Sequence, residues 1–378
     1  MITITDKQKC CGCYACMNVC PVHCITMVKD TEGFYYPSVL TQKCIRCDKC
    51  QNICPIKNKR HIEKYQNTAI AAYAKDEIIR KKSSSGGAYY VLARSIINSG
   101  GIVYGARYSE DFKYVYHTAV TENSELERII GSKYIQSRID TVYLQVLDLV
   151  RNNKLVLFSG TPCQIEGLYS ILGRDYDNLF TIDIVCHGVP SELIWQRYLN
   201  SSKIDNIQNV NFRDKTNGWT NYSLSVVNEN SRLIIPHSQN TYMQAFIQGY
   251  TLRPSCYDCK FKGTERISDI TLGDLWGASK ISNIENGDTG ISLLVINSKK
   301  GKQLLEKNKP FLVIQQIDLT QAIQYNSSYI KSSTMPQKRN NFFVELDNNS
   351  FSQLFRTKYN QNSIFKRIQN RIRKIIGT

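Results

Sequence analysis

The chain has 378 residues and a formal net charge of +16, and 42% of its residues are hydrophobic. This length exceeds one typical domain and suffices for a substantial buried core. We expect neither a signal peptide nor a membrane span, because Met1 to Lys9 contain no apolar segment and no later apolar run is long enough to cross a bilayer.

Fourteen cysteines occur in a chain without an export signal. This combination indicates a reducing cytoplasm and metal binding rather than disulfides, so we expect a cytoplasmic protein. The basic charge is compatible with nucleic acid, anionic lipid or an acidic protein as partner. We expect no nucleic-acid partner, because no nucleic-acid-binding motif occurs.

Two copies of one cysteine motif open the chain. Each reads C-x2-C-x2-C-x3-C-P, from Cys10 to Pro21 and from Cys44 to Pro55. This is the bacterial ferredoxin motif, in which three cysteines hold one [4Fe–4S] cluster and the fourth crosses to the other cluster. We therefore predict a 2[4Fe-4S] ferredoxin-type domain over residues 1–64. Its two ligand sets are Cys10, Cys13, Cys16 and Cys54, and Cys20, Cys44, Cys47 and Cys50.

Two other interpretations of these cysteines exist. A zinc ribbon requires only pairs of C-x2-C, and a small disulfide framework also uses many cysteines. Two full copies of the motif, each ending in proline, favour iron–sulfur clusters over both. Cys11 and Cys24 remain outside the motif; buried cysteine packs as a small hydrophobe, so neither is assigned as a ligand.

A glycine- and serine-rich turn follows a charged connector and a short predicted strand over 69–73. The segment KKSSSGG, residues 81–87, leads into a predicted helix over 88–97. Ser84 or Ser85 is a natural N-cap for this helix, and the glycines let a ligand approach backbone amides at its start. The segment therefore predicts an anion site, with an ordinary serine-capped helix as the alternative. A strand follows over 102–107.

The middle of the chain alternates helices and strands. The pattern predicts helices over 141–151, 162–172 and 192–199, and strands over 154–159 and 179–185. This βαβα order indicates a parallel sheet with right-handed crossovers. Later segments predict antiparallel strands over 210–213, 222–227 and 232–235, helices over 241–249 and 299–307, and strands over 267–276, 291–296 and 311–317. The predicted fold class is α+β/α/β, a ferredoxin-like domain followed by a mixed-sheet α/β domain.

Four further cysteines, Cys163, Cys186, Cys256 and Cys259, lie outside the ferredoxin motif. The first two each follow a predicted parallel strand, and the carboxyl ends of such strands meet at one edge of a sheet. The last two form a C-x2-C pair, which completes four thiolates for a third [4Fe–4S] cluster. Zinc is the alternative metal, and buried core cysteines are the metal-free alternative. His187, beside Cys186, is expected to hydrogen-bond rather than to ligate.

Seven motifs in order now resemble one known family. They are the ferredoxin motif, SSSGG, GSKYIQS (131–137), GTPCQI (160–165), CHGVPS (186–191), RPSCYDCKFK (253–262) and SDITLGDLWG (268–277). They resemble the beta-subunit family of coenzyme F-420 hydrogenases and dehydrogenases, to about residue 300. The resemblance implies an FAD-containing iron–sulfur reductase. The archaeal hydrogenase subunit lacks the ferredoxin segment and receives electrons from a partner subunit, whereas this chain carries that segment itself.

The resemblance implies FAD at two segments of a domain over 65–345. These are Ser84, Ser85, Gly86 and Gly87, and Ser132, Lys133, Gln136 and Ser137. Serines and glycines suit a pyrophosphate, and Lys133 adds a positive charge; a solvated lysine on a turn is the alternative. Asp274 and Trp276 are expected near the cofactor or the core cysteines, with core packing as the alternative for Trp276.

The predicted cofactors define the predicted activity. Clusters transfer one electron at a time, whereas a flavin accepts two. We therefore expect a flavin-dependent iron–sulfur oxidoreductase that converts between a one-electron carrier and a two-electron substrate. The alternative is a non-catalytic electron-transfer subunit that feeds a partner enzyme. The sequence names neither the small-molecule or coenzyme substrate nor any catalytic residue.

Two basic segments suggest partners. Lys43, Arg46 and Lys49 interleave with the second cysteine motif, which suits an acidic electron carrier such as a ferredoxin. The alternative is that they only offset the negative charge of a cluster. The tail, residues 346–378, is basic, and from Ile364 onward its apolar residues fall near helical spacing. Such a helix can lie on the anionic inner face of a membrane, and a helix docked on its own domain is the alternative.

Overall fold

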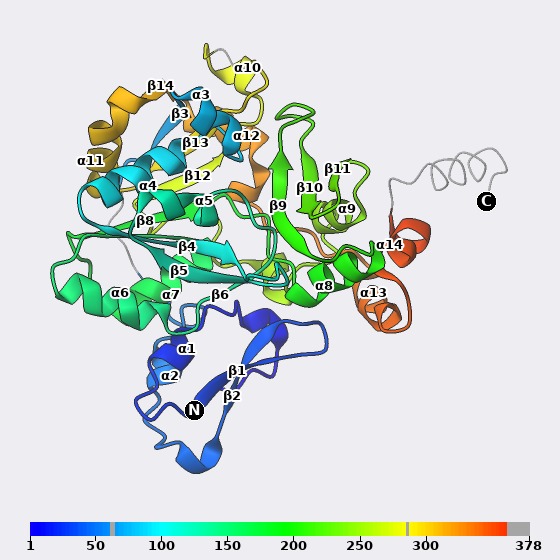
Figure 1. The fold of residues 1–378 in the computed structure, drawn as a ribbon. Coiled ribbons are helices and arrows are strands. Elements are labelled where there is room, and N and C mark those ends of the chain that lie inside the picture. The colour runs from blue at the N-terminus through cyan, green and yellow to red at the C-terminus, as the bar shows by residue number, and fades with distance from the viewer. Residues whose placement is uncertain (61–64, 285–286, 361–378) are drawn as a thin grey trace.

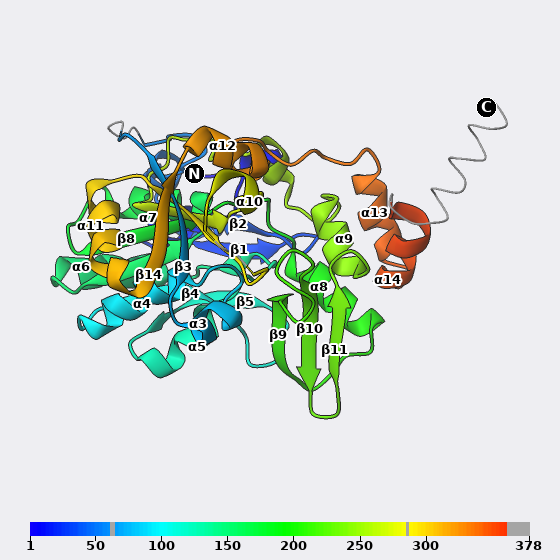
Figure 2. The same ribbon diagram turned by 90° about the horizontal axis from the view of Figure 1, so that it is seen from above.

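The structure is a computed structural model that describes residues 1–60, 65–284 and 287–360. An N-terminal segment, residues 1–60, lies against one side of a large α/β unit, and a smaller lobe lies beside that unit (Figure 1). Figure 2 shows the same arrangement from above, with β9, β10 and β11 forming a separate small sheet.

The N-terminal segment has a repeated backbone design. Each cysteine motif contains a one-turn helix, α1 (Ala15–Asn18) or α2 (Lys49–Asn52), which follows a residue with left-handed backbone, Tyr14 or Asp48. Between the motifs, β1 (Ile25–Lys29) and β2 (Tyr35–Val39) form an antiparallel hairpin. The two motifs therefore fold alike although their sequences share little besides cysteine and proline.

A nine-stranded mixed sheet forms the centre of the molecule, in the order β14-β3-β13-β12-β8-β7-β4-β5-β6. Strands β4, β7, β8 and β12 are parallel to one another, and β13, β3 and β14 extend the sheet in antiparallel pairs. The strands are β3 (Thr68–Ala74), β4 (Ile102–Tyr108), β5 (Val115–Val120), β6 (Ser137–Arg138), β7 (Val156–Gly160), β8 (Leu179–Ile184), β12 (Ile270–Asp274), β13 (Ser292–Ile296) and β14 (Leu312–Ile317).

Helices cover both faces of this sheet because its strands are apolar on both sides. On one face, α4 (Ala88–Asn98), α5 (Leu126–Ile129) and α11 (Lys299–Asn308) pack in one buried cluster. On the other, α6 (Val142–Arg151) and α7 (Pro162–Leu172) pack in a second. The short helices α3 (Glu77–Lys82), α10 (Ala278–Ile281) and α12 (Leu319–Tyr325) lie around β3 and β13.

The smaller lobe is built on aromatic packing. Its elements are α8 (Glu192–Ser201), β9 (Ile207–Asp214), β10 (Ser223–Asn228), β11 (Arg232–Pro236), α9 (Thr241–Ile247), α13 (Arg339–Leu346) and α14 (Phe351–Leu354). Trp195 from α8, Phe212 from β9 and Tyr242 from α9 contact one another, with ring centroids 5.2 to 5.6 Å apart. Such ring pairs stabilise a lobe that has only a three-stranded sheet.

The sequence predictions of the α/β pattern agree with the structure. The predicted parallel strands are β7 and β8, and the three antiparallel strands are β9, β10 and β11. The sequence did not indicate β5 or the helices α3, α12, α13 and α14. The prediction of a serine N-cap for α4 was wrong. Its N-cap is Gly87, with φ of 86° and no side-chain cap, and Ser84 and Ser85 instead hydrogen-bond to other segments.

The C-terminal tail divides at residue 360. Phe351, Phe355 and Tyr359 are buried in the aromatic cluster of the small lobe, so this part of the predicted tail packs on the chain itself. The predicted basic amphipathic helix from Ile364 onward lies outside the described residues. Among the helices of the described ranges, none is long and apolar enough to cross a membrane.

Candidate functional site

The eight motif cysteines form two groups of four in the N-terminal segment. One small cavity is bordered by Cys10, Cys13, Cys16 and Cys54, and a second by Cys20, Cys44, Cys47 and Cys50; Cys11 also borders the first and Cys24 the second. These are the sets expected when the fourth cysteine of each motif crosses to the other half. Four thiols around a void fit a cubane cluster, whose four irons each take one protein thiolate. We call them the inner quartet and the outer quartet.

The two quartets differ in exposure. Two cysteines are buried in each quartet, Cys13 and Cys16 in the inner one and Cys20 and Cys50 in the outer one, but only the outer quartet has an exposed cysteine, Cys47. Helix α1, which carries Cys16, contacts α7 of the main sheet. Burial raises the pKa of the Cys16 thiol well above its usual value, so coordination to iron is what would deprotonate it. The inner quartet therefore faces the α/β unit and the outer quartet faces solvent.

A third group of four cysteines lies at one edge of the main sheet. Cys163 begins α7 just after β7, and Cys186 follows β8, while Cys256 and Cys259 lie in and just after a 3-10 turn (Pro254–Asp258). All four interact electrostatically with one another. We call them the core quartet. The prediction that distant strand ends would bring these residues together therefore agrees with their placement.

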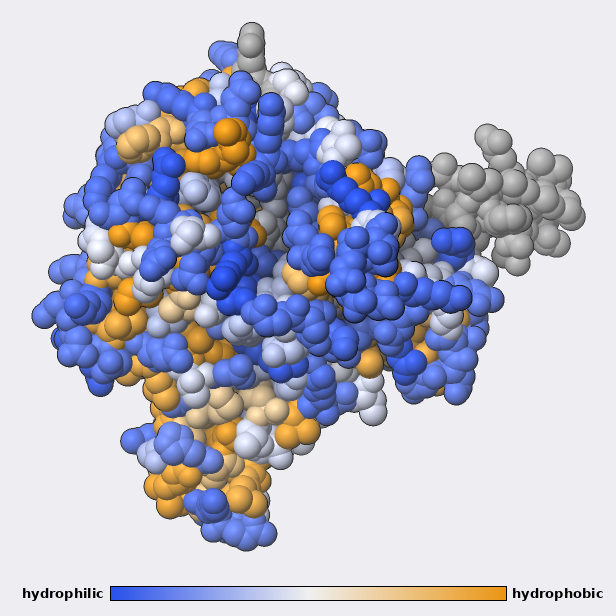
Figure 3. Space-filling view, viewed as in Figure 1, coloured by the Kyte–Doolittle hydropathy of each residue, from blue (hydrophilic) through white to orange (hydrophobic). Residues whose placement is uncertain are grey.

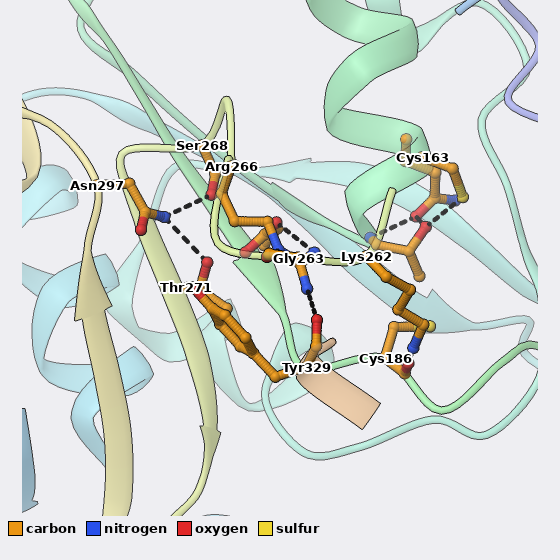
Figure 4. Close-up of polar contacts among 12 residues, drawn as sticks. Cys163, Cys186, Lys262, Gly263, Arg266, Ser268, Thr271, Asn297 and Tyr329 are labelled. Carbon is orange, nitrogen blue, oxygen red and sulfur yellow. Dashed lines mark hydrogen bonds and ion pairs between the residues drawn. The ribbon is translucent and has the colours of Figure 1, made fainter. Parts of the chain in front are cut away.

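Lys262 is the cation of the core quartet. Its Nζ donates hydrogen bonds to the carbonyl oxygens of Cys186 and Ser328, and Figure 4 shows it reaching toward Cys186. Burial raises the pKa of the Cys186 thiol to about 12, and Lys262 opposes this shift. His187 lies beside the core quartet. Its ring contacts Phe246 edge-on, and its Nδ1 lies 3.4 Å from the hydroxyl of Ser333.

Within the described ranges, no group of three or more His, Cys, Asp and Glu residues is arranged to hold a single metal ion. This applies to the motif cysteines of the N-terminal segment as much as to the core quartet.

Cys11 joins the inner quartet to the core quartet. Its thiol is buried and hydrogen-bonds to both Cys13 and Cys163. The Cys11 hydrogen bond is the main cause that lowers the pKa of the Cys163 thiol to about 7. These residues pack with Phe261 in one buried cluster. From the sequence, Cys11 was expected only to pack as a small hydrophobic residue. The residues next to Cys11 in the chain do not indicate that it contacts a distant segment.

A cavity of about 520 Å³ opens next to the core quartet. Six of the eight residues expected at FAD line it: Ser84, Ser85, Gly87, Ser132, Lys133 and Ser137. Cys186, His187, Asp274 and Trp276 border the same cavity. Its volume falls in the range of cofactor and substrate sites. The serine turn and the core quartet, far apart in sequence, therefore share one space.

Two of the expected FAD residues do not border this cavity. The amide of Gly86 donates to the hydroxyl of Ser292, so Gly86 is used for close packing against β13. The side chain of Gln136 donates to the carbonyl of Cys11 and accepts from Arg253, at 3.2 and 3.1 Å. Gln136 therefore faces the N-terminal segment, on the opposite side from the cavity.

Lys133 gives the cavity a positive charge with little solvation. Burial lowers the pKa of Lys133 to about 7. Its Nζ donates to the carbonyl oxygens of Ile130 and Gly131, at 2.8 and 3.2 Å, and among the described residues no carboxylate pairs with it. Ser84 accepts a hydrogen bond from the amide of Ser132 at 2.7 Å, which ties the two lining segments together. A phosphate fits this arrangement, because it supplies the missing negative charge.

Further polar groups at the cavity were not evident from sequence. Burial lowers the pKa of His117 to about 4; its Nε2 bonds to the carbonyl of Ser159, and its Nδ1 is buried without a partner. Arg213 donates to Asp274 at 2.8 Å. A histidine on a β-strand and an arginine near a turn carry no local signal, so only the fold could identify them.

Asp274 and Trp276 border the cavity, as the sequence suggested. Asp274 accepts hydrogen bonds from Arg213 and from the indole of Trp219, at 2.8 and 3.1 Å. Trp276 stacks on Trp219 with ring centroids 4.8 Å apart. The carboxylate is thus neutralised by Arg213, and Trp276, backed by Trp219, forms an apolar part of the cavity wall.

Comparisons with known proteins agree with this picture. Residues 153–320 match the family model of the coenzyme F420 hydrogenase/dehydrogenase beta subunit, C terminus, and residues 9–58 match that of the 4Fe-4S dicluster domain. No curated protein matches the chain. A chain of the F420-reducing [NiFe] hydrogenase complex from Methanosarcina barkeri is similar, at 18% identity and a TM-score of 0.47, over 70% of this chain and 91% of that one. Residues 9–58 are thus similar to 4Fe-4S dicluster domains, and residues 153–320 are similar to the C-terminal part of the beta subunit of coenzyme F420 hydrogenases and dehydrogenases.

Proposed function

We propose that this iron–sulfur electron-transfer protein is an FAD-dependent oxidoreductase that passes electrons between a one-electron carrier and a two-electron substrate. One observation carries the proposal: the cavity that suits a flavin borders Cys186, and Cys11 connects Cys163 to Cys13. The inner quartet, the core quartet and the cavity are thus neighbours in that order. Clusters transfer single electrons and a flavin takes two, so this order suits conversion between them.

The core quartet is proposed to hold a third [4Fe–4S] cluster. One feature supports iron rather than zinc: the position of the thiols between a dicluster domain and a cavity. The Nζ of Lys262 would offset the negative charge of the cluster. Cys163 has a thiol pKa lowered to about 7, so it loses its proton most readily when iron binds.

The cavity is proposed to hold FAD. Lys133 and the hydroxyl of Ser84 suit the pyrophosphate, and the apolar face of Trp276, which stacks on Trp219, suits a ring system. Bound flavin would exchange two electrons with the substrate. His117 stays neutral at physiological pH, so it can hydrogen-bond to a ligand without adding charge.

Metal and flavin content test both assignments. The full-length protein, purified without oxygen, should contain about twelve iron atoms and one FAD. Replacing Cys256 and Cys259 by serine should leave about eight iron atoms, whereas Cys24→Ser, outside both predicted ligand sets, should leave twelve. Lys133→Met should release FAD and keep the iron. Zinc in the core quartet, or twelve iron atoms after the double change, would contradict the third cluster.

The electron carrier is proposed to dock at the outer quartet. Lys43, Arg46 and Lys49 are exposed there, and Ile45 among them is 60% exposed. Figure 3 shows hydrophobic surface mixed with hydrophilic surface at that end of the molecule. Exposed apolar residues ringed by cations suit transient contact with an acidic protein.

The second candidate is a subunit that passes electrons to a partner enzyme without binding a substrate of its own. The cavity of about 520 Å³ favours the enzyme, because it gives this chain a small-molecule site of its own. Anaerobic turnover of the purified protein with F-420, nicotinamides and quinones separates the two functions. Reduction of one of these by the isolated protein supports the enzyme, and flavin reduction without turnover of any acceptor supports the subunit.

A further inference from the structure

Arg253 is a buried cation without an anionic side-chain partner. Its side chain is fully buried, three residues before Cys256 in the chain. Across the described part of the chain, no Asp or Glu forms an ion pair with it, although Arg138, Arg266 and Arg339 each have one. A buried guanidinium with no counter-charge is strongly unfavourable. A negative group other than a carboxylate is therefore expected close to Arg253.

The hydrogen bonds of Arg253 point to the inner quartet. Its Nε donates to the carbonyl of Cys10 at 2.7 Å, and its Nη2 lies 3.5 Å from the Cys10 sulfur. The remaining bonds go to the carbonyl of Tyr35 and the amide oxygen of Gln136. The charge of Arg253 also interacts with the thiols of Cys11 and Cys256. The guanidinium thus lies between the inner quartet and the core quartet.

Gly12 makes this approach possible. Its φ is 65°, and a Cβ built on it would lie 2.7 Å from Nη1 of Arg253 and 2.9 Å from Nε2 of Gln136. Any other residue between Cys11 and Cys13 would push the guanidinium away from the loop that carries the inner quartet. Glycine therefore serves two purposes here: it permits the left-handed turn, and it leaves room for a cation.

Burial makes a cluster in the inner quartet harder to reduce, and the positive charge of Arg253 offsets this effect. A [4Fe–4S] core of charge 2+ with four thiolates carries about −2, and reduction adds one more negative charge. Adding charge in a buried place is less favourable than adding it beside solvent. Each quartet has two buried cysteines, but only the outer quartet has an exposed one, Cys47. The inner quartet is also covered where α1 packs on α7, so burial alone would leave the electron on the outer quartet.

The cations at the outer quartet stabilise a reduced cluster less than a buried cation does. Lys43, Arg46 and Lys49 are exposed, and salt screens exposed charges over about 8 Å. Arg253 is fully buried, so its charge is screened far less. The strongest electrostatic stabilisation of a reduced cluster in the N-terminal segment is therefore at the inner quartet.

We propose that Arg253 is a positioning residue that raises the reduction potential of the inner cluster, so that electrons accepted at the outer quartet move inward. This inference rests on the function proposed above, because it requires a cluster in each quartet. The step is a transfer of one electron: the outer cluster is oxidised by one electron and the inner cluster is reduced by one. The reductant is the one-electron carrier at the outer quartet, and no proton is transferred.

The test is a potentiometric titration of the full-length protein, without oxygen, followed by electron paramagnetic resonance. In Arg253→Gln, one cluster of the N-terminal segment should become at least tenfold harder to reduce, which is 59 mV for one electron, and the other should not change. Arg253→Lys should keep most of the wild-type potential because it keeps the charge.

A second variant keeps Arg253 in place. Gln136→Glu puts a carboxylate where the amide oxygen accepts from Arg253 at 3.1 Å, so it neutralises the cation without leaving a void. The same cluster should again be harder to reduce. If Arg253→Gln fails to assemble its clusters, Gln136→Glu decides the matter alone.

Arg339→Gln is the matched control. Arg339 is also buried and also joins the N-terminal segment to the rest of the chain, but it pairs with Glu32 at 2.6 Å. Its replacement should leave both potentials unchanged. Unchanged potentials in Arg253→Gln and Gln136→Glu, or an equal shift of both clusters, would overturn the proposal. A wild-type protein without two clusters in its N-terminal segment would instead overturn the proposed function.

Discussion

Gly167 of α7 faces Cys13 across the boundary between the N-terminal segment and the main sheet. A Cβ built on Gly167 would lie 3.0 Å from the Cβ of Cys13 and 2.9 Å from the hydroxyl of Tyr143. No side chain fits between the helix that carries Cys163 and the loop that carries the inner quartet. The contact between these two cysteine groups therefore depends on a glycine in the middle of a helix, where glycine is otherwise unfavourable.

Gly167→Ala should weaken this contact. The added methyl group overpacks the boundary, at a cost of about 1–3 kcal/mol in the free energy of unfolding, and it moves Cys13 away from Cys163. We expect full iron content but slower electron transfer from the N-terminal clusters to the flavin, measured by stopped-flow absorbance. Ser170→Ala on the same helix is the control and should leave the rate unchanged. An unaltered rate in Gly167→Ala would show that electrons take another path.

Reduction by an acidic ferredoxin should depend on salt. If Lys43, Arg46 and Lys49 attract the carrier, the rate should fall markedly between low and physiological ionic strength, where the Debye length is about 8 Å. Replacing these three residues by Gln should slow the reaction in the same way and leave reduction by dithionite intact. The same change at Lys299, Lys302 and Lys307, on and around α11 far from the outer quartet (Figure 1), should have no effect. A rate indifferent to both salt and the first triple change would refute docking at this surface.

Binding of FAD should take up a proton near Lys133. The pKa of this lysine is lowered to about 7 by burial, so at pH 8 it is mostly neutral in the flavin-free protein. A pyrophosphate beside it favours the charged form and raises its pKa. Affinity should therefore fall as pH rises above about 7. Calorimetric titration of flavin-free protein at pH 8, in two buffers of different ionisation enthalpy, should show proton uptake that Lys133→Met abolishes and the exposed Lys154→Met retains. Equal uptake in both variants would contradict the assignment.

Glu166 should destabilise the protein as pH rises. Burial raises the pKa of this carboxyl from 4.5 to about 7, and its buried Oε2 has no hydrogen-bond partner among the described residues. The native state therefore binds more protons than the unfolded state between these values, so stability decreases with pH across this window. Glu166→Gln should be more stable than wild type by about 3 kcal/mol at pH 8 and equally stable at pH 4. Anaerobic urea titrations measure this, with the exposed Glu122→Gln as the control; a gain that is the same at both pH values would rule the explanation out.

The cysteine pattern predicted which thiols lie together around the two small cavities of the N-terminal segment. The motif C-x2-C-x2-C-x3-C-P determines which thiols a tight turn can bring together, and the crossing of Cys20 and Cys54 follows from it. The core quartet needed one more step, from strand order to a shared sheet edge, which worked because β7 and β8 are neighbours in a parallel sheet. Both predictions rest on rules about residues within one motif or about neighbouring strands of a sheet.

Other features depend on tertiary structure and escaped sequence reasoning. Gln136 was expected at the cofactor, but Ile135 and Ser137 border the cavity and Gln136 does not, because side chains alternate along an extended segment. The role of Arg253 depends on contacts with Cys10 and Tyr35, more than 200 positions earlier in the chain. A pattern within one segment carries no information about such pairs.

The unequal exposure of the two quartets has a consequence for damage by oxygen. Both motifs have the same backbone, including the left-handed residue before α1 and α2, so their surroundings rather than their folds distinguish them. Cys47 is open to solvent, and α7 lies over the inner quartet. Air should therefore bleach the outer cluster first. The outer quartet could then be rebuilt with new iron and sulfide while the N-terminal segment stays docked and the buried cofactors remain intact.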